Sequence, residues 1–501
     1  MRSFLPALVL SLTLLACSKA TGYGVPCCVT AESCAAVGLT EPTGCAGGLA
    51  CVEGGCRPAA CVIDADCTSP DAPYCADGVC LACDGARGCD ASAPSCDLEV
   101  GACGGCAGDD DCGGFADRPW CADDGACVGC RDDLDCGADA PVCAGGACRG
   151  CAADDECDSG ACELTTGACV ADAAIVALAP DGDDARPCTA AAPCATLPRA
   201  LEVRTDARPH VVMAPGSYPH ASATLVAAAG RPRVVIHGAG AILTPAGSYT
   251  ALGIWDHDLD VRGLAVADDF HLALYRVGGT VDALAVAGQL TIIDSELALV
   301  APTVDGGLVR AIRGVLTIDR GVFHHATVEL SRAAFDVHDS LFVEGPLAGI
   351  RVLIGAGPGA VHRLAHNTFV DNAREAPGVD AQIDCVDVAT PMTFLHNVVV
   401  ADRSAAVGHQ LLAGANCELS RSLAYQPAPM AAVAGADNLT QAPGFVDAVF
   451  GDFRPAAGSP LVDAAGLGEA FAPDAVDLAG APRLVGARAD LGAYERQADE
   501  P

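Results

Sequence analysis

The chain has 501 residues, a formal net charge of −36 at pH 7 and a pI near 4.4. This acidity excludes nucleic acid as a partner, because a phosphate backbone requires a basic surface patch. Lys19 is the only lysine, which removes Schiff-base chemistry and a lysine-dependent phosphate site. Aromatic residues make up 4% of the chain, so extensive stacking on sugar rings is not expected.

The first residues describe an export signal. Arg2 supplies a charged start, residues 4–15 are an apolar run, and Ala16 and Cys17 follow. The run is shorter than the roughly 20 apolar residues that cross a bilayer. We therefore expect a cleaved signal peptide over residues 1–16.

Residues 14–17, Leu-Leu-Ala-Cys, resemble the lipobox of bacterial lipoproteins, whose cysteine receives a diacylglycerol before cleavage. The resemblance implies that Cys17 is lipidated and that residues 17–26 tether the protein to a membrane. Ser18 follows where an aspartate would indicate retention at the inner membrane, so the outer membrane or cell surface is expected. The alternative is an ordinary signal peptide with a chance cysteine.

Residues 27–169 hold 26 of the 31 cysteines and no histidine. Without Cys17, 30 cysteines remain, an even number that can pair completely in an oxidising compartment. The region has too few large apolar side chains for a core. We expect disulfides to hold it instead, each contributing about 2–4 kcal/mol.

The cysteines after a six-cysteine module form five units of about twenty residues. In the first unit they are Cys61, Cys67, Cys75 and Cys80. The first two cysteines of every unit are separated by five residues, and two residues separate neighbouring units. Four cysteines allow three pairings, so the sequence predicts disulfides without fixing their partners.

Two metal hypotheses compete with a purely structural role for these units. The junctions, such as residues 80–83, have zinc-knuckle spacing, but paired cysteines in an exported region favour disulfides. Acidic clusters such as residues 109–111 and 154–156 lie between the first two cysteines of most units. Such carboxylates suit Ca²⁺, although a charge run is more commonly a solvated face. We expect no cofactor and keep calcium as the alternative.

Residues 174–497 read as an all-β domain, because short Val, Ile, Leu and Thr runs alternate with Gly, Asp, Asn and Pro. A polar turn followed by apolar residues recurs in steps of 25, 20, 27, 30 and 25 residues, at Ser295, Arg320, Ser340, Asn367, Asn397 and Ser422. Each step suits one coil of a solenoid whose strands pair with those one turn away. We predict a parallel β-helix.

Both ends of this domain carry family-like motifs. Residues 179–201 and 210–218 resemble the start of pectin-lyase-like right-handed parallel β-helix domains, whose first helix covers the open end. Residues 443–463 and 490–495 resemble the terminal signature of choice-of-anchor Q domains in bacterial surface proteins. The resemblance implies an all-β right-handed parallel β-helix preceded by a disulfide-rich, loop-dominated stalk.

The resemblance to such β-helix domains also implies structural roles for the remaining polar residues and cysteines. The closing motif would use Asp463, Asp490, Tyr494 and Glu495 for turns and capping rather than catalysis. Cys188 with Cys194 would staple the N-terminal cap, and Cys385 with Cys417 would join neighbouring coils. Asn367 and Asn397 would stack as an internal asparagine ladder, a structural device of such solenoids.

Catalytic candidates are few. Asp268 and Asp269, near His271, supply two carboxylates, as glycosidases require. Adjacent residues on a strand point to opposite faces, however, and the same objection applies to His324 and His325.

Two further motifs have structural interpretations. Residues 255–258, Trp-Asp-His-Asp, are interpreted as a turn, because lone motif matches are unreliable. His362 and His366 would share one face of a strand, but no third metal ligand is apparent, so a solvated or turn-packed pair is favoured. We therefore assign no catalytic and no metal-binding residue.

The sequence thus predicts an exported, lipid-anchored protein without enzymatic activity. Its β-helix would bind polysaccharide or another cell-surface ligand, and the cysteine-rich region would act as a spacer. The alternative is a polysaccharide lyase or glycoside hydrolase of the pectin-lyase-like fold.

Overall fold

The computed structural model describes residues 49–52, 55–58, 61, 63–68, 73–76, 79–83, 88–97, 102–227, 232–357, 359–373, 381–401, 410–427, 433–466, 471–472 and 474–497. Cys17 and the predicted signal peptide and tether lie outside the described residues. The chain divides into two compact units, Met1–Cys157 with Cys162–Cys169, and Asp158–Ala161 with Val170–Pro501. Within the described ranges, no helix has the length and apolar character needed to cross a membrane.

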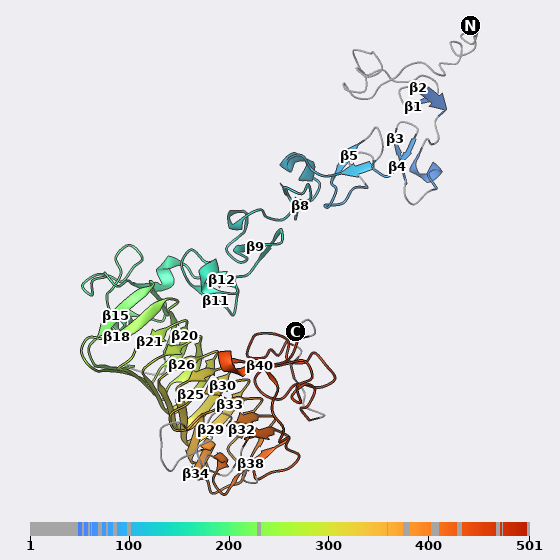
Figure 1. The fold of residues 1–501 in the computed structure, drawn as a ribbon. Helices are drawn as coiled ribbons and strands as arrows, with labels where there is room; N and C mark the ends of the chain where they lie inside the picture. Colours follow the sequence, from blue (N-terminus) through green and yellow to red (C-terminus); the bar gives the residue numbers. More distant parts are fainter. Residues whose placement is uncertain are drawn as a thin grey trace, which may run out of the picture. The chain divides into compact units, whose positions relative to one another are not determined.

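The described part of the first unit contains short antiparallel hairpins, one in each cysteine module (Figure 1). The hairpins are β1 (Leu49–Val52) with β2 (Gly55–Pro58), β3 (Tyr74–Ala76) with β4 (Val79–Leu81), β5 (Ser95–Asp97) with β6 (Ala102–Gly104), β7 (Trp120–Cys121) with β8 (Cys127–Val128), β9 (Val142–Ala144) with β10 (Ala147–Arg149), and β11 (Cys162–Glu163) with β12 (Ala168–Cys169). Four described 3-10 turns precede hairpins: η1 (Asp64–Asp66), η2 (Asp109–Cys112), η3 (Asp133–Asp135) and η4 (Asp154–Glu156).

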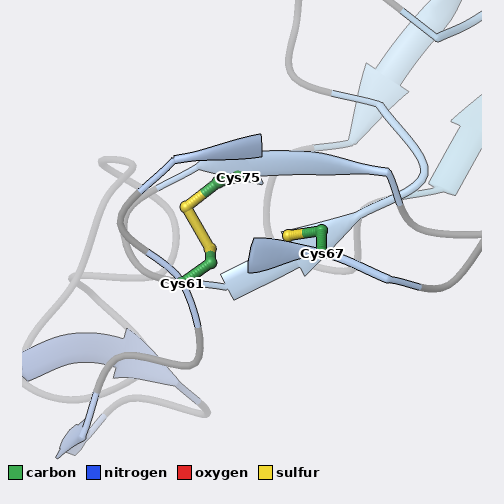
Figure 2. A group of neighbouring side chains, drawn as sticks. All are labelled: Cys61, Cys67 and Cys75. Carbon is green, nitrogen blue, oxygen red and sulfur yellow. A yellow bond between two sulfur atoms is a disulfide. The ribbon is translucent and has the colours of Figure 1, made fainter. Parts of the chain in front are cut away.

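In every four-cysteine repeat the first cysteine is bonded to the third and the second to the fourth. Figure 2 shows the bond between Cys61 and Cys75 beside Cys67, whose own partner is Cys80. The same pairing gives Cys83–Cys96, Cys89–Cys103, Cys106–Cys121, Cys112–Cys127, Cys130–Cys143, Cys136–Cys148, Cys151–Cys162 and Cys157–Cys169. Zinc knuckles require thiolates, so these bonded sulfurs cannot form them.

The acidic clusters hold the backbone of their own repeats. Asp109 Oδ1 accepts the N–H of Cys121 at 2.9 Å, and Asp111 Oδ2 accepts the N–H of Ala107 at 2.7 Å. An acid accepts the N–H of the third cysteine in the same way in three other repeats: Cys75 to Asp64 at 2.8 Å, Cys143 to Asp133 at 2.6 Å and Cys162 to Asp154 at 2.9 Å. These carboxylates therefore have a structural role that requires no bound ion.

The second unit is a parallel β-helix (Figure 1). Its 10-stranded sheet is face A, and its 17-stranded sheet covers two further faces, B and C. Each strand pairs in parallel with a strand of the next coil, so its backbone hydrogen bonds are made between coils. The chain passes from face B to face C to face A in each coil. The predicted fold class, an all-β right-handed parallel β-helix after a disulfide-rich region, is confirmed.

The strands divide among the faces as follows. Face A contains β15 (Gly216–His220), β18 (Ala241–Pro245), β21 (Ala265–Val266), β24 (Ala285–Val286), β26 (Thr303–Asp305), β28 (Val322–His324), β30 (Leu341–Val343), β33 (Thr368–Val370), β36 (Val398–Val400) and β39 (Leu423–Tyr425). Face B contains β16 (Ala223–Val226), β19 (Thr250–Trp255), β22 (Phe270–Tyr275), β31 (Ile350–Ile354), β34 (Ala381–Asp387) and β37 (Gln410–Ala413). Face C contains β13 (Ile175–Leu178), β14 (His210–Met213), β17 (Arg233–His237), β20 (Asp258–Arg262), β23 (Gly278–Asp282), β32 (His362–Ala365), β35 (Met392–Leu395) and β38 (Cys417–Ser420). Three long strands turn the corner from face B to face C: β25 (Gln289–Val300), β27 (Leu308–Asp319) and β29 (Thr327–His338).

Alternate side chains point inward and form one continuous core. Phe323, Phe342 and Phe369 occupy equivalent positions in three coils of face A, and neighbouring rings stack with centroids 4.6 and 4.7 Å apart. Parallel register places equivalent residues of successive coils at the strand spacing of about 4.8 Å, so like side chains form rows.

One predicted coil step is wrong. Ser295 pairs with Gly314, 19 residues later, at the corner between faces B and C. Arg320 lies at the corner between faces C and A, two residues before the start of β28. The 25-residue step from Ser295 to Arg320 therefore joins two different corners, whereas the later steps follow one corner.

Asn367 and Asn397 stack in a buried ladder at the corner between faces C and A, as predicted. Oδ1 of Asn367 accepts the N–H of Ser340 at 3.0 Å, and Oδ1 of Asn397 accepts the N–H of Asn367 at 3.0 Å. Ser422 and Asn438 continue it, because Ser422 Oγ binds the N–H of Asn397 at 3.0 Å and Asn438 Oδ1 binds that of Ser422 at 3.1 Å. The ladder satisfies corner N–H groups that water cannot reach.

The helix α2 (Leu197–Val203) covers the N-terminal end of the core with its buried residues Leu197, Ala200 and Leu201. It begins at Thr196, whose Oγ1 accepts the N–H of Arg199 at 3.3 Å. Nearby, the turn η5 (Asp172–Ala174) leads into β13. Two disulfides complete the unit: Cys188–Cys194 beside β13, and Cys385–Cys417 between β34 and β38 of the next coil.

The C-terminal segment closes the last coil and then folds back along face A. Leu419 donates its N–H to Ala434 O, and Leu439 donates its N–H to Ser422 O, both at 2.8 Å. Residues 443–497 follow and include β40 (Phe445–Asp447), η6 (Ala448–Phe450) and β41 (Asp452–Pro455). They pack on outward side chains of face A in a second apolar cluster that contains Leu341, Val370, Val398, Leu423, Phe453, Leu461 and Leu491. The sequence predicted a polar closure over the last coil; most of the segment instead covers an apolar side face.

Candidate functional site

A hollow of about 490 Å³ lies between face A and the β40–β41 hairpin. Outward side chains of face A form one wall, and the hairpin with η6 forms the other. Its large apolar lining residues are Val322, Leu341, Val343, Val370, Val400, Phe445, Val449, Phe450 and Phe453. We call this hollow the lateral groove.

The lateral groove is apolar because face A carries hydrophobic side chains on both sides of its strands. In β30, Phe342 points into the core, while Leu341 and Val343 on the opposite side are also buried. All three residues of Val398–Val400 in β36 are likewise buried. A strand covered on both sides reads as a continuous hydrophobic run, and the C-terminal segment provides the second cover.

The hairpin side of the groove ends in exposed apolar residues. Phe450 is 87% exposed and Val449 is 74% exposed, both in η6. Gly451, with φ of 82°, ends this turn and lets the chain return in β41. Large apolar side chains at the mouth of a hollow are typical of a ligand-binding surface.

Polar groups border the same groove. Glu344 and Asp371 follow β30 and β33 with φ of 57° and 50°, and both line the groove together with His324. The two acids occupy equivalent positions of neighbouring coils, because Val343 pairs with Val370. The groove therefore combines apolar contacts with hydrogen-bond acceptors.

Two histidines and two carboxylates meet beside the groove. The Nδ1 atoms of His324 and His325 lie 3.4 and 3.5 Å from Oδ1 of Asp305. The two imidazole centroids are 4.0 Å apart. Nε2 of His325 lies 3.1 Å from Oε2 of Glu344. We call these four residues the histidine cluster.

The sequence interpretation placed His324 and His325 on opposite faces of a strand, and this is wrong. Side chains alternate only while both residues keep an extended backbone. His324 ends β28, and His325 has φ of 50°, which turns the chain and brings both rings to Asp305. A strand pattern in the sequence contains no signal for this backbone angle.

A second hollow, of about 530 Å³, lies where face A turns into face B. Asp268 and Asp269 both line it, together with Tyr249. They lie in a turn before β22, and Asp269 has φ of 57°, so the objection drawn from strand alternation does not apply. His271 contacts Tyr249 Oη at 3.0 Å and Thr291 Oγ1 at 2.9 Å, and burial lowers its pKa.

The Trp-Asp-His-Asp motif forms a turn, as interpreted. Asp256 has φ of 61° at the corner between faces B and C. Its Oδ2 lies 2.6 Å from Nη2 of Arg276 in the next coil. Trp255 stacks on Tyr275 with ring centroids 3.9 Å apart.

His362 and His366 do not share one face. His362 packs against Phe335, with centroids 5.2 Å apart, and accepts the N–H of Ala356 at 3.3 Å. His366 follows the end of β32 and is fully buried, with Nδ1 2.6 Å from Nη2 of Arg483. The predicted shared face is therefore absent, and His366 is packed in a turn.

The predicted closing residues act on backbone groups of the C-terminal segment. Glu495 accepts the N–H groups of Val485 at 3.1 Å and Asp490 at 2.8 Å, and Asp490 accepts that of Asp463 at 2.7 Å. Burial raises the pKa of Glu495 to about 7 and that of Tyr494 to about 12. Neither residue lines either hollow, so closure accounts for these shifts better than catalysis.

The sequence does not predict the lateral groove, because its two walls are distant in the chain. The uninterrupted Val398–Val400 run was a usable signal, since a strand with one solvated face alternates. The apolar pair Val449 and Phe450 inside a turn segment was another.

Comparisons with known proteins give one short family match and one distant structural likeness. A protein-family model described as "Family of unknown function (DUF8331)" matches residues 84–175, which cover most of the cysteine repeats and end at the first residue of β13. A search of curated proteins finds no match. Among solved structures, the crystal structure of pectate lyase Pel9A is 13% identical, with a TM-score of 0.39 and coverage of 65% of this chain and 100% of that chain. A likeness at this level carries no argument about activity.

Proposed function

We propose that the protein is a non-enzymatic cell-surface binding protein whose lateral groove holds a polysaccharide chain. The observation that carries this proposal is the groove itself, with its apolar wall, its exposed Phe450 and its acceptors Glu344 and Asp371. Sugar rings present apolar C–H faces and hydroxyl donors, and such a groove satisfies both.

Charge favours an uncharged or amine-bearing polysaccharide. The chain carries a net charge of −36, and the groove itself contains Glu344 and Asp371. A polyanion would be repelled, most strongly at low ionic strength. Hydroxyl groups and protonated amines instead donate hydrogen bonds to these carboxylates.

A glycan panel tests the proposal with the full chain and neutral, amine-bearing and acidic oligosaccharides. Titration calorimetry should detect binding of a neutral or amine-bearing sugar. Phe450→Ala should weaken it at least about ten-fold, because aromatic anchors dominate such contacts. Leu484→Ala is the matched control: Leu484 is 54% exposed in the same segment but does not line the groove. Equal affinity of Phe450→Ala and wild type would show that the sugar does not bind in the lateral groove.

The second hollow supports one alternative, a glycoside hydrolase or polysaccharide lyase. Asp268 and Asp269 present two carboxylates to one space, and glycosidases use two carboxylates about 5–9 Å apart. The same sugars are assayed for new reducing ends and unsaturated products. Turnover that is lost in Asp269→Asn and kept in Phe450→Ala would make the protein an enzyme acting at this hollow.

The proposal also places a lipid on Cys17, with the cysteine repeats as a spacer between membrane and β-helix. Disulfides throughout Cys61–Cys169 support an oxidising, extracytoplasmic location. Labelled palmitate should be incorporated by wild type, and Cys17→Ser should lose the label and leave the membrane fraction. Label that persists in Cys17→Ser would contradict this anchor.

A further inference from the structure

We infer that Asp305, His324 and His325 form a binding site for a divalent transition-metal ion, with Zn²⁺ as the ion that fits best. The site would stand beside the lateral groove. The inference rests on the geometry of the histidine cluster and does not depend on polysaccharide binding, so each can fail without the other.

The separation between Oδ1 of Asp305 and each of the two histidine Nδ1 atoms matches one shared ion. In a tetrahedral zinc site with bonds of about 2.0–2.2 Å, neighbouring ligand atoms are about 3.3–3.6 Å apart. Oδ1 of Asp305 lies 3.4 Å from Nδ1 of His324 and 3.5 Å from Nδ1 of His325. Two imidazoles and one carboxylate suit zinc and similar ions, whereas Ca²⁺ and Mg²⁺ take oxygen ligands.

Glu344 occupies the position of an orienting carboxylate. Its Oε2 lies 3.1 Å from Nε2 of His325, the ring nitrogen opposite the one that faces Asp305. When Nδ1 of His325 binds an ion, Nε2 carries the ring proton and donates a hydrogen bond to Oε2 of Glu344. This contact fixes the ring and makes it a better ligand.

The scaffold arranges the ligands before any ion arrives. Asp305 ends β26, His324 ends β28, and these two residues are register partners in neighbouring coils. His325 follows with φ of 50°, at the corner that leaves face A. Ligands fixed on paired strands need little reorganisation. Three protein ligands leave a fourth position for solvent or a bound molecule beside the groove, which His324 and Glu344 also line.

The competing explanation is that the four side chains make only polar contacts with one another. The two explanations predict different responses to an added metal ion. A cluster of polar contacts gains no stability from Zn²⁺, whereas a metal site is stabilised by the ion that it binds.

The test titrates the full, disulfide-oxidised chain with ZnCl₂ and with CoCl₂ after chelator treatment and a thiol assay, because thiolates would bind zinc themselves. We expect one saturable site per chain and visible Co²⁺ absorption bands. His324→Gln and Asp305→Asn should each weaken Zn²⁺ at least ten-fold, and Glu344→Gln by about 10–100-fold. His271→Gln is the matched control, because its ring nitrogens contact the hydroxyls of Tyr249 and Thr291.

A thermal readout separates loss of metal from loss of fold. Zn²⁺ should raise the Tm of wild type and not that of His324→Gln, while both have the same Tm in EDTA. Asp305→Asn gives a second variant at a side chain that is 70% exposed. The inference is overturned if wild type shows no saturable binding, or if both variants bind Zn²⁺ as tightly as wild type.

Discussion

Buried corner residues carry the backbone strain of the β-helix. His366 and His396 have φ of 55° and 57°, and each is followed by a buried asparagine, Asn367 or Asn397. A residue other than glycine held in this region costs on the order of 1–3 kcal/mol. The asparagine ladder offsets this cost, because each side chain binds a corner N–H of the preceding coil.

Asn367→Ala should lower the free energy of unfolding by about 2–4 kcal/mol, because it leaves the buried N–H of Ser340 and carbonyl of Val337 without their side-chain partner. Denaturant titration followed by circular dichroism measures the loss. Asn416→Ala is the control: this half-buried residue donates one bond, to Val388 O, and its loss should cost less than half as much. Equal losses of unfolding free energy in the two variants would show that the ladder stabilises the fold no more than an isolated side-chain hydrogen bond.

The closing segment, residues 443–497, is joined to the β-helix through the buried guanidinium of Arg483. Arg483 is 1% exposed, and its Nε lies 3.0 Å from Oδ1 of Asp339 while its Nη2 donates to Gly492 O at 2.5 Å. Breaking a buried pair by removing one partner costs about 3–5 kcal/mol. Arg483→Met should therefore release the segment to limited proteolysis under native conditions. Arg488→Met, at an exposed position, should leave the cleavage rate unchanged; equal protection of Arg483→Met would contradict this role.

The closing segment should be more stable against local unfolding in mild acid than at neutral pH. Burial raises the pKa of Glu495 from 4.5 to about 7, and it also raises those of Asp477 and Asp490. Between pH 4.5 and 7 the unfolded segment loses the Glu495 proton while the folded segment keeps it, so stability falls as pH rises; the raised pKa values of Asp477 and Asp490 act in the same direction. For Glu495 the change is on the order of 3 kcal/mol.

Hydrogen exchange measures this effect locally. After correction for intrinsic rates, amides of residues 477–495 should be at least ten-fold better protected at pH 5 than at pH 8. Core amides of β27 and β29 supply the internal control, because they lie outside the closing segment. Equal protection of residues 477–495 at both pH values would show that these acids do not govern closure.

At the scale of elements, the sequence predicts the strands and the ladder, because both follow from periodicity and turn residues. It does not predict the cysteine partners, since three pairings satisfy the same spacing. It also misplaces His324 with His325 and Asp268 with Asp269, because φ of His325 and Asp269 departs from a strand. The lateral groove could not be predicted, because it forms where residues 443–455 pack on face A. Local sequence patterns do not show which distant residues are in contact.

The two units of the whole molecule are stabilised by different forces. Cys61–Cys169 contain ten disulfides and small apolar clusters made largely of cysteine. The β-helix has a continuous apolar core and two disulfides. A crosslinked unit depends on restricting its unfolded chain, whereas a solenoid depends on burial between neighbouring coils.

Reduction of the disulfides should therefore unfold the first unit and leave the β-helix folded. With dithiothreitol at neutral pH, residues 61–169 should lose nearly all amide protection, because removing disulfides from a small domain typically costs about 2–5 kcal/mol per bond. Residues 289–343, which contain β25, β27 and β29 and lie between the two disulfides of the β-helix, should keep their protection, because the apolar core remains. Hydrogen exchange on oxidised and reduced protein reads both units in one sample. Loss of protection in residues 289–343 on reduction would mean that the solenoid depends on its crosslinks, and that its apolar core alone does not keep it folded.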